Sequence, residues 1–96
     1  MYVRIARFEG AEGDQEQQIA EVRQQMAAGM REQVIPVKRG LMLVDRKNGT
    51  GASVLFCESE DDLRQVDEYM NSMNPSGPGS RVSVDMYEVA VDSDEL

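Results

Sequence analysis

The chain has 96 residues, enough for one domain, and its formal net charge of −8 makes nucleic acids and anionic membranes unsuitable partners. It contains no histidine, which excludes Ser-His and Cys-His catalysis as well as histidine-ligated haem. The single cysteine, Cys57, excludes an intramolecular disulfide and fits a reducing compartment.

The first predicted elements are a strand and a helix. Residues Tyr2 to Phe8 alternate and are rich in β-forming side chains, which predicts a strand. Asp14 is placed to cap a helix, and Gly29 and Pro36 mark the end of that helix and the connection after it. The apolar side chains of the helix recur at helical spacing and form one stripe of Ile19, Val22, Met26 and Met30.

A hairpin is predicted at the centre of the chain. Val37 to Arg46 and Thr50 to Cys57 are two apolar, strand-like segments. They flank Asn48-Gly49, a dipeptide that suits the positive backbone angles of a tight hairpin turn. The two segments should therefore be antiparallel neighbours in a sheet.

The second half of the chain again predicts a helix followed by a strand. Ser59 to Asp62 resembles a capping box that opens a helix. Asn74 to Gly79 predicts a loop, Arg81 to Val91 a fourth strand, and Asp92 to Leu96 a frayed acidic tail. We therefore expect a single domain over residues 1–91, followed by that tail. The apolar stripe of the second helix consists of Leu63, Val66, Met70 and Met73.

This βαββαβ order is the ferredoxin-like arrangement, an α+β fold. It predicts a four-stranded antiparallel sheet with both helices on one face. The strands are nevertheless apolar on both sides, as where Leu41 and Leu43 alternate with Met42 and Val44. A bare face of this kind would expose a larger apolar patch than monomers usually carry. We therefore expect a homodimer in which two copies pack sheet to sheet.

Three segments carry a resemblance to known proteins: the opening strand YVRIARFEG, the hairpin GLMLVDRKNGTGASVLFCESEDDL and the closing strand VSVDMYEVA. Through them, nearly the whole chain resembles the dimeric α/β-barrel superfamily and, within it, the antibiotic-biosynthesis-monooxygenase-like (ABM-like) proteins. The resemblance implies two ferredoxin-like subunits whose sheets form a shared barrel. It also implies a pocket between the sheet and the helices of each subunit, suited to a small apolar or aromatic ligand.

Members of this superfamily differ in what they do. Some oxygenate aromatic polyketides without metal or flavin, some degrade haem, some isomerise small lactones and some sense amino acids. The chain has neither tryptophan nor histidine, so the residues that the better-defined enzymes use for haem binding or ring contacts are missing. No catalytic motif matches, so no catalytic residue is transferred from the resemblance, and a shared fold does not transmit function.

The candidate site residues follow from strand alternation. Tyr2 and Arg4 in the first strand, and Asp85 and Tyr87 in the last, are predicted to alternate onto one face. Pairing of these strands would bring Arg4 close to Asp85, the partner that a buried arginine needs. The cluster would orient a phenolic or carboxylate substrate, with Tyr87 or Tyr2 as a hydrogen-bond donor, or it would be an ion pair at the dimer interface or sheet edge. The same face would also carry Ser53, Cys57 and Ser83.

Two functions are open on this basis. One is a cofactor-independent, monooxygenase-like enzyme that acts on a small aromatic or polyketide-like substrate, although the sequence offers no convincing base. The alternative is a non-enzymatic dimeric module that binds a small ligand or another protein. The methionines of the stripes and an inert Cys57 are expected to fill the core. We expect neither metal nor cofactor, in a cytoplasmic protein without a signal peptide or a membrane span.

Overall fold

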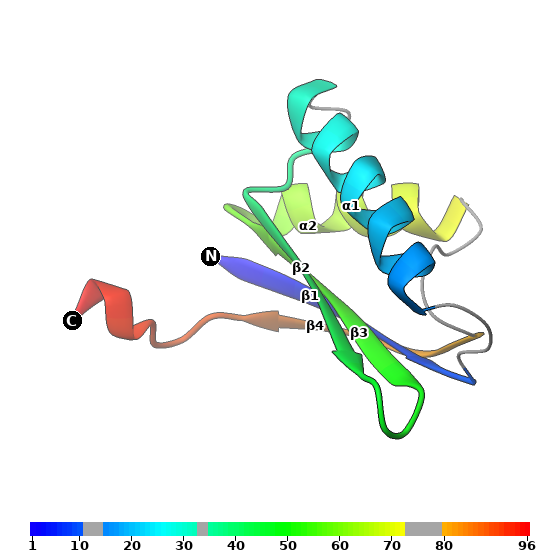
Figure 1. The fold of residues 1–96 in the computed structure, drawn as a ribbon. Helices are drawn as coiled ribbons and strands as arrows, with labels where there is room; N and C mark the ends of the chain where they lie inside the picture. The colour runs from blue at the N-terminus through cyan, green and yellow to red at the C-terminus, as the bar shows by residue number, and fades with distance from the viewer. Residues whose placement is uncertain (11–14, 33–34, 73–79) are drawn as a thin grey trace.

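The computed structural model describes residues 1–10, 15–32, 35–72 and 80–96 (Figure 1). The described elements confirm the predicted βαββαβ order and the α+β class. They are β1 (Tyr2–Glu9), α1 (Gln15–Glu32), β2 (Arg39–Asp45), β3 (Thr50–Cys57), α2 (Glu60–Ser72), β4 (Ser80–Glu88) and the short 3-10 helix η1 (Ser93–Glu95).

The four strands form one antiparallel sheet in the order β2-β3-β1-β4, so β3 and β1 are the central strands. Tyr2 lies opposite Cys57 of β3 on one side and opposite Glu88 of β4 on the other. The β1–β4 register shifts between Arg7 and Phe8, where β4 carries an irregularity. This central position explains why β1 contributes so many of the buried side chains: Val3, Arg4, Ala6 and Phe8.

Both helices lie on the same face of the sheet, which we call the helix face, and the opposite face is called the open face (Figure 1). α2 packs on the central strands β1 and β3, whereas α1 contacts the edge strand β2. The two helices differ in burial, because α2 buries Leu63 and Val66 while no residue of α1 is buried. The core on the helix face is built around Cys57, Leu63 and Val66, with Tyr2, Leu55 and Met70 packed against it.

The start of α2 confirms the predicted cap. The Ser59 hydroxyl accepts a hydrogen bond from the backbone N–H of Asp62 at 3.1 Å. Three acidic residues follow in the first turn, Glu60, Asp61 and Asp62, where they complement the positive end of the helix dipole. Local sequence signals therefore fix the beginning of this helix.

The hairpin occurs where predicted, but its turn is longer than a two-residue loop. Asp45 pairs with Thr50, which leaves residues 46–49 in the turn, and Gly49 adopts a φ of 67°. The Asp45 carboxylate accepts hydrogen bonds from the side chain of Asn48 at 2.8 Å and from the backbone N–H groups of Lys47 and Asn48. These bonds hold the pKa of Asp45 below its ordinary value, with the Asn48 side chain as the largest cause.

We expect Asp45→Ala to lower the denaturation midpoint at pH 7, because the charged carboxylate organises the turn. The pKa of Asp45 is lower in the folded than in the unfolded chain. Its contribution is therefore complete above the unfolded pKa of about 4 and disappears as the pH falls through the folded value. Urea denaturation of the wild type and the variant between pH 2.5 and pH 7 measures this. A difference in midpoint that persists unchanged at the lowest pH would contradict the assignment.

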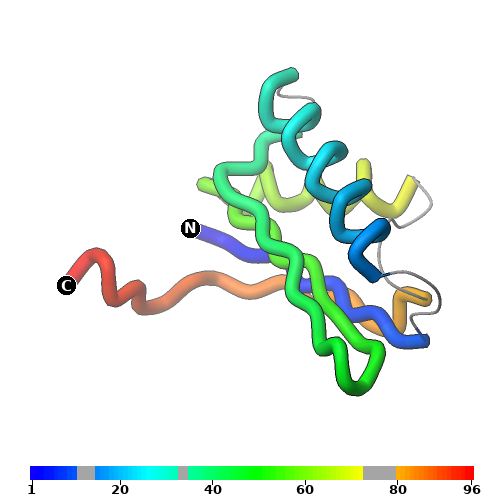
Figure 2. The backbone as a smooth tube through the Cα atoms, viewed as in Figure 1, coloured from blue at the N-terminus to red at the C-terminus, as the bar shows by residue number. Residues whose placement is uncertain are grey.

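Some boundaries differ from the sequence predictions. Gly29 lies inside α1, which continues to Glu32, and β4 ends at Glu88. The acidic tail is not simply frayed, since Asp92 caps η1 by accepting from the backbone N–H of Asp94 at 2.9 Å. Figure 2 shows this tail leading away from the rest of the domain. The predicted Asp14 cap and the loop at residues 74–79 lie outside the described residues.

Candidate functional site

The predicted polar cluster is divided between the two faces of the sheet. In the β1–β4 register, Arg4 lies opposite Met86, and Asp85 lies opposite Ile5. Because directly opposed residues in antiparallel strands point to the same face, and successive residues alternate, Arg4 and Asp85 point to opposite faces. The predicted proximity of Arg4 and Asp85 is therefore wrong, because the register differs by one residue from the one that it required.

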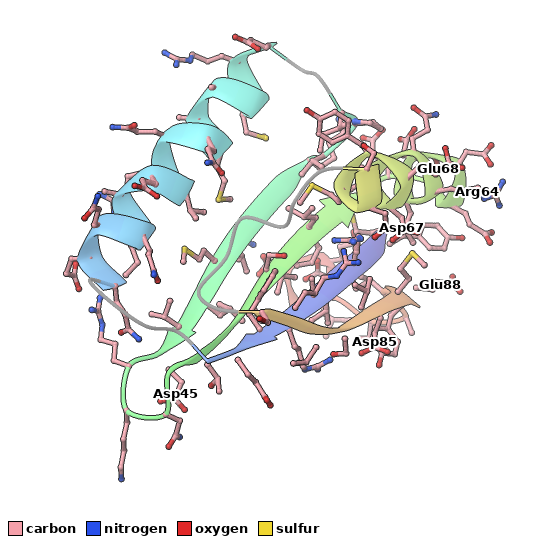
Figure 3. All side chains as sticks on the ribbon, turned by 90° about the vertical axis from the view of Figure 1, so that its right-hand side faces the viewer. Asp45, Arg64, Asp67, Glu68, Asp85 and Glu88 are labelled. Atoms are coloured by element: carbon pink, nitrogen blue, oxygen red, sulfur yellow. The ribbon has the colours of Figure 1, made fainter. Side chains whose placement is uncertain are left out.

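Arg4 is buried on the helix face, with 1% of its surface exposed. Its Nε donates to Asp67 Oδ1 at 3.0 Å, and its Nη2 donates to Asn71 Oδ1 at 3.4 Å. Arg81 of β4 donates to the same Asn71 oxygen at 2.9 Å. Figure 3 shows Asp67 on the side of α2 that faces the sheet. Arg4 therefore links the central strand β1 to α2. Its guanidinium forms its hydrogen bonds with residues of the same subunit.

Asp85 and Tyr87 belong to the open face. The Asp85 carboxylate accepts from Arg7 Nη1 at 2.9 Å, in an exposed ion pair. Tyr87 is 53% exposed, whereas Tyr2 packs against the core of the helix face. The four candidate residues thus form two pairs on opposite faces, and they do not assemble into one site.

Cys57 is fully buried on the helix face, as expected for a core thiol. Burial raises the pKa of this thiol, and the negative charge of Asp62 adds to the effect. The thiolate, which is the reactive form, is therefore disfavoured at neutral pH.

A groove of about 410 Å³ lies between α1 and β2 on the helix face. The Met26 side chain of α1 reaches across to β2 at Gly40, where an added Cβ atom would come within 2.6 Å of Met26 Cε. The apolar walls are formed by Ile19, Val22 and Met26 of α1 and by Met42 and Val44 of β2.

Two arginines complete the lining of the groove, Arg23 from α1 and Arg46 from the hairpin turn. Arg46 makes an ion pair with Glu16 at the start of α1. Arg23 is exposed, and within the described part of the chain it forms no ion pair. The groove therefore has apolar walls, with the guanidinium groups of Arg23 and Arg46 beside them.

The sequence pattern does not predict this groove. The methionines of the α1 stripe are expected in the core, because periodicity does not distinguish an apolar stripe that is fully covered from one that is not. Gly40 is a glycine on the helix face of an edge strand, and its missing side chain leaves room for Met26 of α1.

A second hollow, also of about 410 Å³, lies at the hairpin end of the sheet. Its lining includes Leu43 and Ala52 of the open face, with Val82 and Arg7 at its other side. Leu43 and Val82 are 48% and 54% exposed, so apolar surface remains uncovered at this end of the sheet.

No protein-family model and no curated protein matches the chain. Within residues 1–10, 15–32, 35–72 and 80–96, no group of three or more His, Cys, Asp or Glu side chains is arranged to hold a metal ion. The described helices also include none that is long and apolar enough to cross a membrane.

Proposed function

We propose that this chain is a homodimeric binding protein that holds a small, largely apolar ligand in the groove between α1 and β2. The observation that carries the proposal is the incomplete packing of α1. This helix has 18 residues and an apolar stripe, yet none of its residues is buried. A groove of about 410 Å³, walled by that stripe, falls within the roughly 300–1,000 Å³ of known ligand pockets.

Occupancy by a ligand would remove this apolar surface from water. Burial of apolar area is favourable by about 25 cal/mol per Å², so a ligand that fills the groove would stabilise the contact between α1 and β2. The ABM-like resemblance supports the same position, since it implies a pocket between the sheet and the helices.

Binding is favoured over catalysis by the chemistry of the lining. A general base must lie within hydrogen-bonding distance of the proton that it removes. The described lining consists of aliphatic, methionine and arginine side chains, and it includes none of Tyr2, Arg4, Asp85 or Tyr87. A monooxygenase-like reaction on a small aromatic or polyketide-like substrate would thus need a base from elsewhere. We therefore propose a non-enzymatic binding module in preference to an enzyme.

The homodimer is supported by the open face. Its central positions are apolar, with Val3, Ile5 and Val54 on the two inner strands. Four strands of about eight residues present a face of roughly 500 Å², so two copies packed together would bury about 1,000 Å², close to the lower limit for specific interfaces. By strand alternation the face carries two basic and three acidic side chains, so its net charge is only −1 although the chain carries −8: Arg7, Arg39, Glu9, Asp45 and Asp85.

Such a pair would be a dimeric α/β barrel of the ABM-like kind, with helices on the outside and both grooves accessible. A reducing, cytoplasmic location is part of the proposal, because the single cysteine is a buried free thiol.

The binding function is tested with a neutral apolar probe, 2-naphthol, by isothermal titration and thermal shift. We expect saturable binding and a rise in melting temperature, since a ligand that binds the native state stabilises it. Val22→Trp fills the groove and should raise the Kd at least tenfold. Gln24→Trp, on the exposed side of the same helix, is the matched control and should bind as the wild type does. Equal binding by the two variants, or no saturable binding by the wild type, would refute the proposal.

A further inference from the structure

We propose that the groove selects flat aromatic carboxylates, and that Arg23 binds their carboxylate group. This inference rests on the proposed binding function and specifies the chemical class of the ligand. It follows from three independent features: the local charge of the groove, the availability of Arg23, and the composition of the walls.

The charge of the groove is opposite to that of the protein. The chain has 18 acidic and 10 basic side chains. The groove is nevertheless lined by two arginines and, among its described lining residues, by no acidic side chain. An anion repelled by most of this surface is therefore attracted at the groove, which is the charge complementarity that binding sites use for specificity.

Arg23 is the cation that remains available to a ligand. Arg46, the other arginine of the lining, is engaged by Glu16. Arg4 and Arg7 are likewise held in ion pairs, with Asp67 and Asp85. Arg23 has no such partner in the described ranges, and its planar guanidinium offers two parallel N–H groups that match a carboxylate.

The walls favour an aromatic body for the ligand. Met26 and Met42 lie on opposite walls, one from α1 and one from β2. Thioether sulfur makes favourable contacts with aromatic rings, and methionine adapts its shape to the molecule that it covers. Val22 and Val44 complete the walls with rigid aliphatic surface. A flat ring system between the two walls would place its carboxylate at the solvent-facing side, where Arg23 lies.

The test compares 2-naphthoate with the neutral 2-naphthamide by isothermal titration of the full chain at pH 7. We expect the wild type to bind 2-naphthoate about tenfold more tightly, because a charge-assisted hydrogen bond is stronger than a neutral one. Arg23→Gln should remove this preference, because the affinity for 2-naphthoate falls to that for 2-naphthamide. Arg31→Gln makes the same charge change on the same helix outside the groove, so it should keep the preference.

Two further measurements separate a specific contact from a general charge effect. Arg23→Lys keeps the charge but loses the bidentate geometry, so it should retain part of the preference. Raising the salt concentration should weaken 2-naphthoate binding and leave 2-naphthamide binding unchanged.

The possible failures are distinguishable. Equal affinity of the wild type for the two compounds, or an equal loss of preference in Arg23→Gln and Arg31→Gln, would overturn the assignment of Arg23 and leave the binding function intact. Saturable binding of neither compound, nor of 2-naphthol, would overturn the proposed function together with this inference.

Discussion

Asp67→Ala is expected to destabilise the fold by about 3 kcal/mol, the largest effect that we predict for a single substitution. Asp67 accepts the 3.0 Å hydrogen bond from Arg4, whose side chain is 1% exposed. Removing the carboxylate would leave a buried guanidinium without its counter-charge, which is far more costly than losing an exposed ion pair. Since domains of this size are stable by about 5–15 kcal/mol, the loss is a large share of the total.

Urea denaturation followed by circular dichroism measures this change. Asp61→Ala is the matched control on the same helix, because Asp61 pairs with Arg64 at 3.6 Å on the exposed side. That substitution should change stability by less than about 1 kcal/mol, from the exposed ion pair and the helix dipole together. Adding Arg4→Met to Asp67→Ala should recover most of the loss, because it removes the buried charge and keeps apolar volume. Similar losses for Asp61→Ala and Asp67→Ala, or no recovery in the double variant, would contradict the structural role of the pair.

The second large effect concerns assembly: Tyr87→Glu is expected to turn the proposed homodimer into a monomer. Tyr87 is 53% exposed on the open face, so the substitution should not unfold the subunit. In the dimer it would place a charge, and its two-fold copy, in an interface that must exclude water. We expect the dimer dissociation constant to rise by at least a hundredfold, measured by sedimentation velocity at micromolar concentrations.

A neighbouring residue on the same strand provides the control. Met86 is 47% exposed, close to the value for Tyr87, but it points to the helix face. Met86→Glu should therefore leave the dimer intact. Leu43→Glu, on the opposite edge strand but on the open face, should dissociate it as Tyr87→Glu does. A monomeric wild type, or a dimer equally weakened by Met86→Glu and Tyr87→Glu, would refute sheet-to-sheet pairing.

The parts of the fold that the sequence predicts correctly are those with local causes. The Ser59 cap needs only the next three residues, and the position of the hairpin needs only the turn between Asp45 and Thr50. The helix start and the hairpin together give the order of the elements, and this order is enough to predict the ferredoxin-like topology.

The errors arise where distant segments meet. The partner of Arg4 depends on the register of β1 against β4, and a shift of one residue exchanges the two faces. The actual partner, Asp67, is one of several acidic residues of α2, and the sequence does not indicate which of them faces Arg4. The groove is a tertiary feature as well, since its walls come from α1 and β2, which meet only in the folded chain.

The strand order has a consequence for how the chain folds. β1 occupies the centre of the sheet, but both of its neighbours come much later in the chain: the pairing nearest in sequence joins Phe8 to Gly51, and the most distant joins Tyr2 to Glu88. Long-range pairings of this kind are slow to form, because the entropy of closing a long loop is lost before the contacts are made. The β2–β3 hairpin can form early, whereas β1 emerges from the ribosome well before either partner. A newly made chain would therefore expose an unpaired apolar strand, the stage at which chaperones protect against aggregation.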